Sequence, residues 1–222
     1  MISEKGLCKI LKSAYKGGGY TIIPQTVQQD GPAGKWRRNE IIINGATWAV
    51  RCETVDLPGE AAVQIVKDAG YLPVEAINIQ KGAPNQLVLE EVAEQRHDLL
   101  RRQNTDAVRM RQIPVIFRER WQLYQTEEGK VFAFDLELLK LIDFKEVEPD
   151  VAMTADGHLG MFTWGSTAVY LAPGRFSRAN EEKILYIAGL DWENQISTDD
   201  PVANVSLFDA NRDEPLAERE DG

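Results

Sequence analysis

Cysteine and histidine are scarce in this chain of 222 residues, which contains two of each. Two cysteines cannot form a disulfide framework, and the first residues lack the basic-then-apolar order of a secretory signal. We therefore expect free thiols and a cytoplasmic location. No apolar run approaches the roughly 20 residues of a membrane-spanning helix, so we expect no membrane partner.

Metal-ligand and nucleophile patterns are also sparse. Glu94 and His97 have the spacing of half a carboxylate di-metal site, but His158 has no Glu three positions before it to supply the second half. We therefore predict no metal and no cofactor. Neither histidine lies in a recognisable catalytic context, so we predict no enzyme. The 35 acidic residues nevertheless leave open an enzyme whose site is not recognisable from sequence.

Basic residues are outnumbered, 25 against 35, which gives a net charge of −10. Residues 195–222 carry eight acidic side chains and two arginines, a net charge of −6, so the first 194 residues carry only −4. We expect residues 209–222 to be a disordered acidic tail. Because nucleic-acid-binding domains are more often basic, the charge favours a protein partner.

One segment of this acidic chain is basic. Arg96–Arg120 holds seven arginines against three acidic residues, a net charge of +4. It is either a solvated helix and linker or a patch for phosphate or an acidic partner. Trp36 lies among cations, either as an exposed interface contact or as a tryptophan folded onto the core. The candidate partner-binding residues are Trp36, Arg37, Arg38, Arg96, Arg101, Arg102, Arg109, Arg111 and Trp121.

Local patterns predict helices and tight hairpins. Ser3–Lys16 has one apolar face at helical spacing. Ile41–Ile43 and Thr47–Val55 flank Asn44-Gly45, a strong hairpin turn signal. Asp56 is expected to cap the following helix, which Gly70 closes. Gln28–Asn39 is polar and rich in turn residues, so we expect a loop there. Strands joined by tight turns predict an α+β fold of antiparallel meanders and hairpins with packed helices.

The connector Gln103–Asp106 is the best boundary, which predicts an N-terminal α+β unit at 1–103 and a C-terminal α+β unit at 107–208. Gly45–Val50 aligns with Gly165–Tyr170, and Pro58-Gly59 has a counterpart in Pro173-Gly174. This echo leaves open two related α+β units. Restricted turn chemistry would produce the same echo by chance.

The opening segment Leu7–Tyr20 (LCKILKSAYKGGGY), followed by Asn44-Gly45 and Trp48–Val50, resembles uncharacterised accessory proteins of bacterial phages and mobile elements. The resemblance covers about the first 60 residues, and its motifs are structural, so it assigns no functional residue. It implies a context in which acidic inhibitors of host defence nucleases occur. Such inhibitors display carboxylates that mimic a phosphate array.

Three hypotheses follow from the sequence. The first is a non-catalytic, acidic, anti-CRISPR-like binding protein that occupies the surface of a host defence protein in the host cytoplasm. The second is a nucleic-acid-binding accessory protein that uses Arg96–Arg120. The third is the enzyme without a recognisable site, which a perturbed carboxylate in a deep pocket would support.

Overall fold

The structure, a computed structural model, describes residues 1–31, 34–102 and 106–190; the side chains of residues 29–31, 34–36, 97, 99, 101 and 102 are not described. The helices in this part of the chain are α1 (Glu4–Gly17), α2 (Gly59–Ala69), α3 (Glu90–Arg102), α4 (Leu136–Leu139) and α5 (Arg178–Ala188), with a 3-10 turn, η1 (Thr54–Asp56). The strands are β1 (Tyr20–Gly31), β2 (Gly34–Asn44), β3 (Trp48–Glu53), β4 (Ile77–Ile79), β5 (Gln86–Leu87), β6 (Val108–Phe117), β7 (Trp121–Thr126), β8 (Val131–Asp135), β9 (Asp150–Met153), β10 (Gly160–Trp164) and β11 (Thr167–Leu171).

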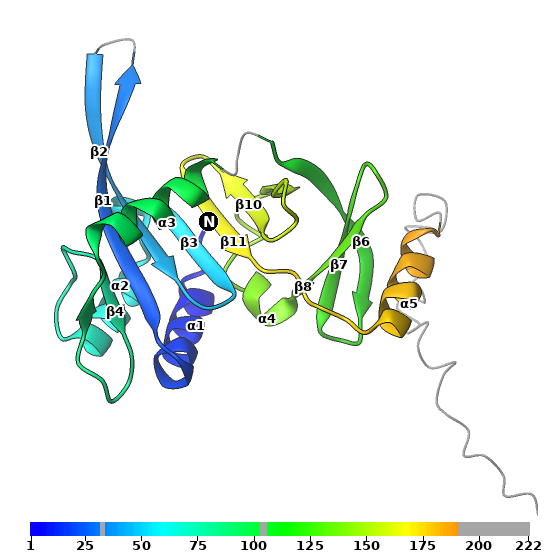
Figure 1. Ribbon diagram of the computed structural model, residues 1–222, viewed down its shortest axis with the longest axis horizontal. Helices are drawn as coiled ribbons and strands as arrows, with labels where there is room; N and C mark the ends of the chain where they lie inside the picture. The colour runs from blue at the N-terminus through cyan, green and yellow to red at the C-terminus, as the bar shows by residue number, and fades with distance from the viewer. Residues whose placement is uncertain (32–33, 103–105, 191–222) are drawn as a thin grey trace, which may run out of the picture.

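The strands form one antiparallel sheet in the order β5-β4-β1-β2-β3-β11-β10-β9-β6-β7-β8 (Figure 1). Seven of the ten junctions between neighbouring strands in this described sheet join strands that are consecutive in the chain, and the helices pack on its two faces. The predicted α+β fold of antiparallel meanders is therefore confirmed.

Short-range signals place several element ends correctly. The Ser3 hydroxyl accepts a hydrogen bond from the Gly6 amide at 3.2 Å and caps α1, as a serine at this position should. Gly70 closes α2 in the left-handed conformation with a φ of 86°. The predicted cap of α2 is wrong by two residues, because Asp56 ends η1 and Pro58 precedes the helix.

The predicted loop at Gln28–Asn39 is also wrong. The registered pairs of β1 and β2 run from Thr21 opposite Asn44 to Gly31 opposite Gly34. Neighbouring strands pair only with the base of this hairpin, so its outer half projects from the sheet as an arm (Figure 1). The ladder satisfies the backbone polar groups, so two strands form here despite the polar, turn-rich sequence.

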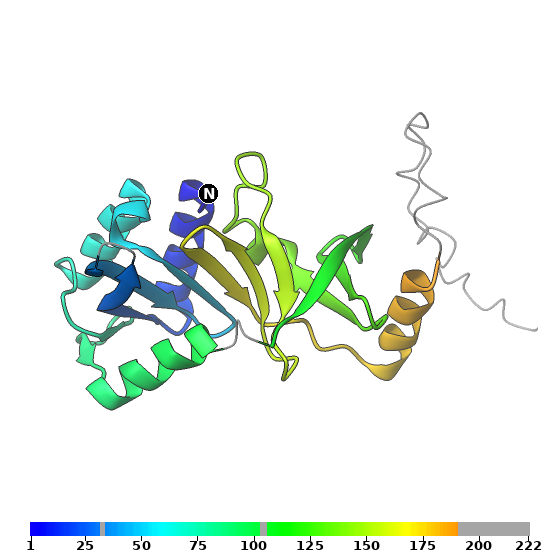
Figure 2. The same cartoon turned by 90° about the horizontal axis from the view of Figure 1, so that it is seen from above.

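Helices cover the two faces of the sheet differently. Helices α1 and α2 lie on one side, here called the first face, and α3 lies on the other, the second face (Figure 2). Tyr124, Phe134 and Phe162 pack edge to face at 5.5–5.6 Å in the first-face core. On the second face α5 packs on β6, β7 and β8 through Ile184 and Ile187.

The two predicted units share one sheet and one core. β3 pairs with β11, which places the fully buried Val50 opposite Val169 and sets the echoed segments side by side. The first-face core draws on residues from Ile2 to Leu171. Residues 103–105 at the predicted boundary and the predicted tail 209–222 lie outside the described residues, and the division and duplication remain predictions.

Packing between the halves is close at Gly6. A Cβ built on Gly6 would lie 1.7 Å from the Lys140 carbonyl oxygen, whereas a Cβ on Gly17, at the other end of α1, meets nothing within 4 Å. Gly6→Ala should therefore force α1 away from the α4 segment and lower the free energy of unfolding by about 2 kcal/mol or more.

Gly17→Ala is the matched control, because it adds the same methyl group to the same helix in open space. We expect it to be neutral or to stabilise by about 0.5–1 kcal/mol. Urea unfolding followed by circular dichroism measures both variants. Equal effects would contradict the close packing of α1 on Lys140.

Candidate functional site

A strip of the second face runs from the core cluster under α3, which includes Ala168, toward the part covered by α5. Strand registers place Arg51 opposite Ala168, Ala168 opposite Thr163, and Thr163 opposite Asp150. The next row continues to Arg109, which lies opposite Ala152. Charged and small side chains therefore line the middle of a sheet whose flanks carry helices.

A groove opens where β6 and β9 separate. The two strands pair at two positions, the second of them Arg109 opposite Ala152, and β6 then continues along β7. The groove has a volume of about 910 Å³. Its lining includes Arg51, Arg109, Arg111, Phe144, Glu148 and Asp150, and we call it the arginine groove.

A second groove of about 800 Å³ adjoins it and shares Gln112, Tyr124 and Phe144 with it. This second groove is lined by Arg120, Asp135 and neighbouring residues. Arg120 donates two hydrogen bonds to Asp135, at 2.6 and 3.0 Å, so its charge is already compensated. The arginine groove is therefore the more suitable of the two for an anionic group.

Arg51 is the most unusual residue in the arginine groove. Arg51 is only 8% exposed, and its Nε has no hydrogen-bond partner within the described part of the chain. Burial raises the pKa of Tyr170; the positive charge of Arg51 opposes this rise and the negative charge of Glu40 adds to it, so both charged groups act on that phenol. A buried charged donor without an acceptor is destabilising, and an anionic ligand would remove that penalty.

A second arginine on the same face is engaged within the protein. Arg38 forms an ion pair with Glu40, which is 1% exposed, and another with Glu53 at 3.4 Å. Arg38 was a candidate partner-binding residue, yet its side chain is 16% exposed and holds two carboxylates together.

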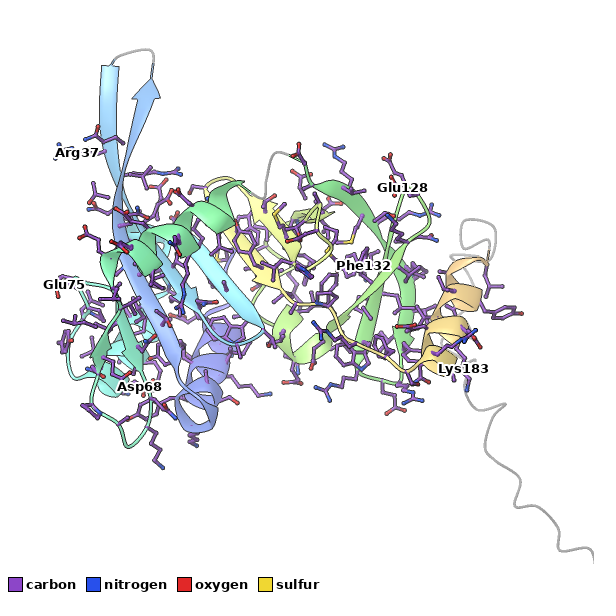
Figure 3. The ribbon with its side chains drawn as sticks, in the orientation of Figure 1. Arg37, Asp68, Glu75, Glu128, Phe132 and Lys183 are labelled. Atoms are coloured by element: carbon purple, nitrogen blue, oxygen red, sulfur yellow. The ribbon has the colours of Figure 1, made fainter. Side chains whose placement is uncertain are left out.

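The structure separates most of the other candidates. Arg109 and Arg111 are exposed and join Arg51 in the arginine groove. Arg96 donates to the Thr21 hydroxyl at 3.2 Å, next to the base of the β1–β2 hairpin. Arg37 lies on the projecting arm, far from Lys183 on α5 (Figure 3). The arginines of the basic segment whose side chains are described therefore do not form one continuous patch.

Of the two candidate tryptophans, Trp121 has contacts in the described structure. Trp121 is half-buried and packs edge to face on Phe176 at 5.2 Å, with the Arg120 guanidinium 5.1 Å from its ring centre. These contacts fit a structural role. The side chains of Trp36, Arg101 and Arg102 lie outside the described residues.

Sequence reasoning missed Arg51. The available signal was a single charged residue inside the otherwise apolar strand segment Trp48–Cys52. Alternation alone would have placed Arg51 on the face opposite Val50, but nothing local in the sequence indicates that β11 covers its flank.

Comparison with protein-family models, with curated proteins and with solved structures finds no match. In the described residues no group of three or more histidine, cysteine or acidic side chains is placed to hold a metal ion. Within the same residues no helix has the length and apolar character needed to cross a membrane.

The two thiols lie in the core. Burial, followed by the nearby negative charges of Asp56, Glu40 and Glu53, raises the pKa of Cys52 to about 12. Burial, followed by Glu60, also raises the pKa of Cys8. His158 lies exposed in the turn after β9, where its amide donates to Asp156 at 3.0 Å. Neither thiol has the lowered pKa of a reactive cysteine.

The raised pKa of Cys52 predicts an unreactive thiol. In a Cys8→Ser variant Cys52 is the single thiol, and at pH 8 it should carry about a thousandfold less thiolate than an ordinary cysteine. Because thiolate forms as pH rises, labelling of the folded protein by Ellman's reagent should be negligible at pH 8 and should begin only as pH approaches the raised pKa. Guanidinium-unfolded protein should react at pH 8. Rapid labelling of the folded variant at pH 8 would support a cysteine-based enzyme instead.

The burial of Arg51 predicts that its charge destabilises the fold. Arg51→Met keeps an unbranched apolar side chain in place of the aliphatic part and removes the guanidinium, so the free energy of unfolding should rise by about 1–3 kcal/mol. Arg178→Met is the control, because Arg178 is exposed on α5 and pairs only with Glu182 at 3.2 Å among the described residues; its effect should stay within about 0.5 kcal/mol. Chemical denaturation measures both. A large loss of stability in Arg51→Met would give Arg51 a structural role.

Proposed function

We propose that this protein is a non-catalytic binding protein that takes an acidic segment of a protein partner into the arginine groove. The observation that carries the proposal is the buried guanidinium of Arg51, whose Nε has no acceptor within the described residues. A carboxylate placed there would gain a charge-assisted hydrogen bond and relieve the cost of burying the charge.

The lining of the arginine groove defines the partner further. Arg109 and Arg111 add positive charge at its open side, while Glu148 and Asp150 limit how much negative charge it accepts. Phe144 is 45% exposed and supplies an apolar wall. The best ligand is therefore a short segment with a few carboxylates and at least one apolar side chain.

A nucleic acid fits the surface less well. Arg118 follows the end of β6 and lies nine residues after Arg109, which corresponds to on the order of 25–30 Å along an extended strand. The Arg118 guanidinium donates to the Asn180 side chain at 2.8 Å. Successive phosphates would find no continuous row of cations between these two arginines.

An added strand is also disfavoured at the edge of β6. Pro114 lies in β6, lacks an amide hydrogen, and so weakens this free edge as a site for pairing with a partner strand. Side-chain contacts thus carry the recognition.

The more specific role that we put forward is inhibition of a host defence protein by a phage or mobile-element protein acting in the host cytoplasm. It rests on the acidic composition and on the resemblance of the first residues. Size-exclusion chromatography with candidate effector nucleases tests it, and the absence of a stable complex with any of them would argue strongly against it.

The groove itself is tested by fluorescence anisotropy with a labelled six-residue peptide of alternating glutamate and leucine. We expect binding that weakens with added salt, and at least about tenfold lower affinity for Arg51→Met, because a buried charged contact is worth about 1.5–3 kcal/mol. Arg178→Met is the control and should bind like the wild type.

Two other outcomes would overturn the proposal. Equal affinity of the wild type and Arg51→Met would remove Arg51 from the binding site. Tighter binding of a labelled DNA duplex or single strand than of the peptide would favour the nucleic-acid alternative, which the dispersed arginines argue against.

A further inference from the structure

The arginine groove lies next to the end of α5. The Ala188 carbonyl oxygen accepts a hydrogen bond from the Gln125 side chain at 3.4 Å. Gln125 on β7 is the registered neighbour of Arg111, which lines the arginine groove. The chain therefore passes beyond α5 at Leu190 beside one wall of the groove.

The residues that follow have the chemistry that the groove is suited to accept. Residues 191–222 carry ten acidic side chains and two arginines, a net charge of −8, and include Trp192, Ile196 and Phe208. An extended chain advances about 3.3 Å per residue, so the first ten of these residues could reach on the order of 30 Å. The path from β7 beside α5 to Arg51 on β3 crosses β6, β9, β10 and β11, which is five strand spacings or about 24 Å, so this length is sufficient.

We propose that the acidic C-terminal segment, residues 191–222, occupies the arginine groove of its own chain and competes with the partner. A carboxylate of this segment supplies the acceptor that Arg51 lacks among the described residues. This inference rests on the proposed function, because it assigns the same groove a second, internal ligand. Binding of the partner then requires displacement of the segment.

The size of the competition follows from tethering. A short flexible connection gives an effective concentration in the millimolar range. If the free segment bound with a dissociation constant of about 0.1 mM, the tethered segment would weaken partner binding about tenfold.

The experiment uses the full chain with five tail carboxylates neutralised: Asp199→Asn, Asp200→Asn, Asp209→Asn, Asp213→Asn and Glu214→Gln. The tail variant should bind the labelled glutamate–leucine peptide about tenfold more tightly than the wild type. The Nε–H resonance of Arg51, identified by its loss in Arg51→Lys, should shift in the tail variant, because its acceptor has changed.

A matched control neutralises five exposed body carboxylates that do not line the groove: Glu90→Gln, Glu94→Gln, Glu127→Gln, Glu146→Gln and Glu181→Gln. It should leave both the affinity and the Arg51 resonance unchanged. An equal gain in affinity from the control would show a general charge effect and overturn the inference.

The remaining outcomes separate the inference from the proposed function. Equal peptide binding by the wild type and the tail variant would remove the tail from the groove and leave the proposed function standing. A lack of peptide binding by every variant would remove the proposed function itself. Light scattering gives the mass of each variant. If the wild type had twice the monomer mass and the tail variant were monomeric, the tail would bind the groove of a second copy, and the internal contact would be overturned.

Discussion

The antiparallel pairing of β3 with β11 joins the two halves of the chain in the middle of the sheet. Val50 and Val169 face each other there with no exposed surface, and the core on that face draws side chains from both halves. This junction fixes which strands flank Arg51 and leaves β9 and β6 to separate farther along the sheet. The groove is thus a consequence of how the two halves meet.

Arg51 lies in this junction, where burying its positive charge is unfavourable. A strand with both neighbours paired favours apolar or hydrogen-bonded side chains, and a buried guanidinium whose Nε has no acceptor among the described residues destabilises it. Its cross-strand neighbour Ala168 is small, which leaves room for the longer side chain. Residues that lower stability in a well-packed region are often those on which binding depends, and this unfavourable burial is the reason for placing the function at Arg51. The acidic composition of the chain, which pointed to protein partners, is concentrated in residues 191–222, which supply carboxylates for the groove.

Some of this structure was accessible from sequence. The helix at Ser3–Lys16 and its neighbour closed by Gly70 depend on interactions between residues a few positions apart, and both were predicted correctly. The hairpin at Asn44-Gly45 was also predicted, but Asn44 is still paired in β2 and the turn itself lies at Ala46-Thr47, closed by the Gly45 amide donating to the Trp48 carbonyl at 2.8 Å. The arm at Gln28–Asn39 was mistaken for a loop, because turn-forming residues signal a loop when no buried face enforces alternation. The prediction that Arg109 and Arg111 belong to a binding surface stays a prediction, now with a groove to act in.

The sequence by itself determined the class of fold, the ends of several helices and the distribution of charge, because each of these depends on local spacing or on composition. Only the tertiary structure decided that β3 lies beside β11, that Arg96 bonds to Thr21, and that Arg51 and Arg109 line the same groove. These relations connect residues more than 50 positions apart. Strand pairing at such separation is chosen by the packing of the whole core and not by any short stretch of sequence.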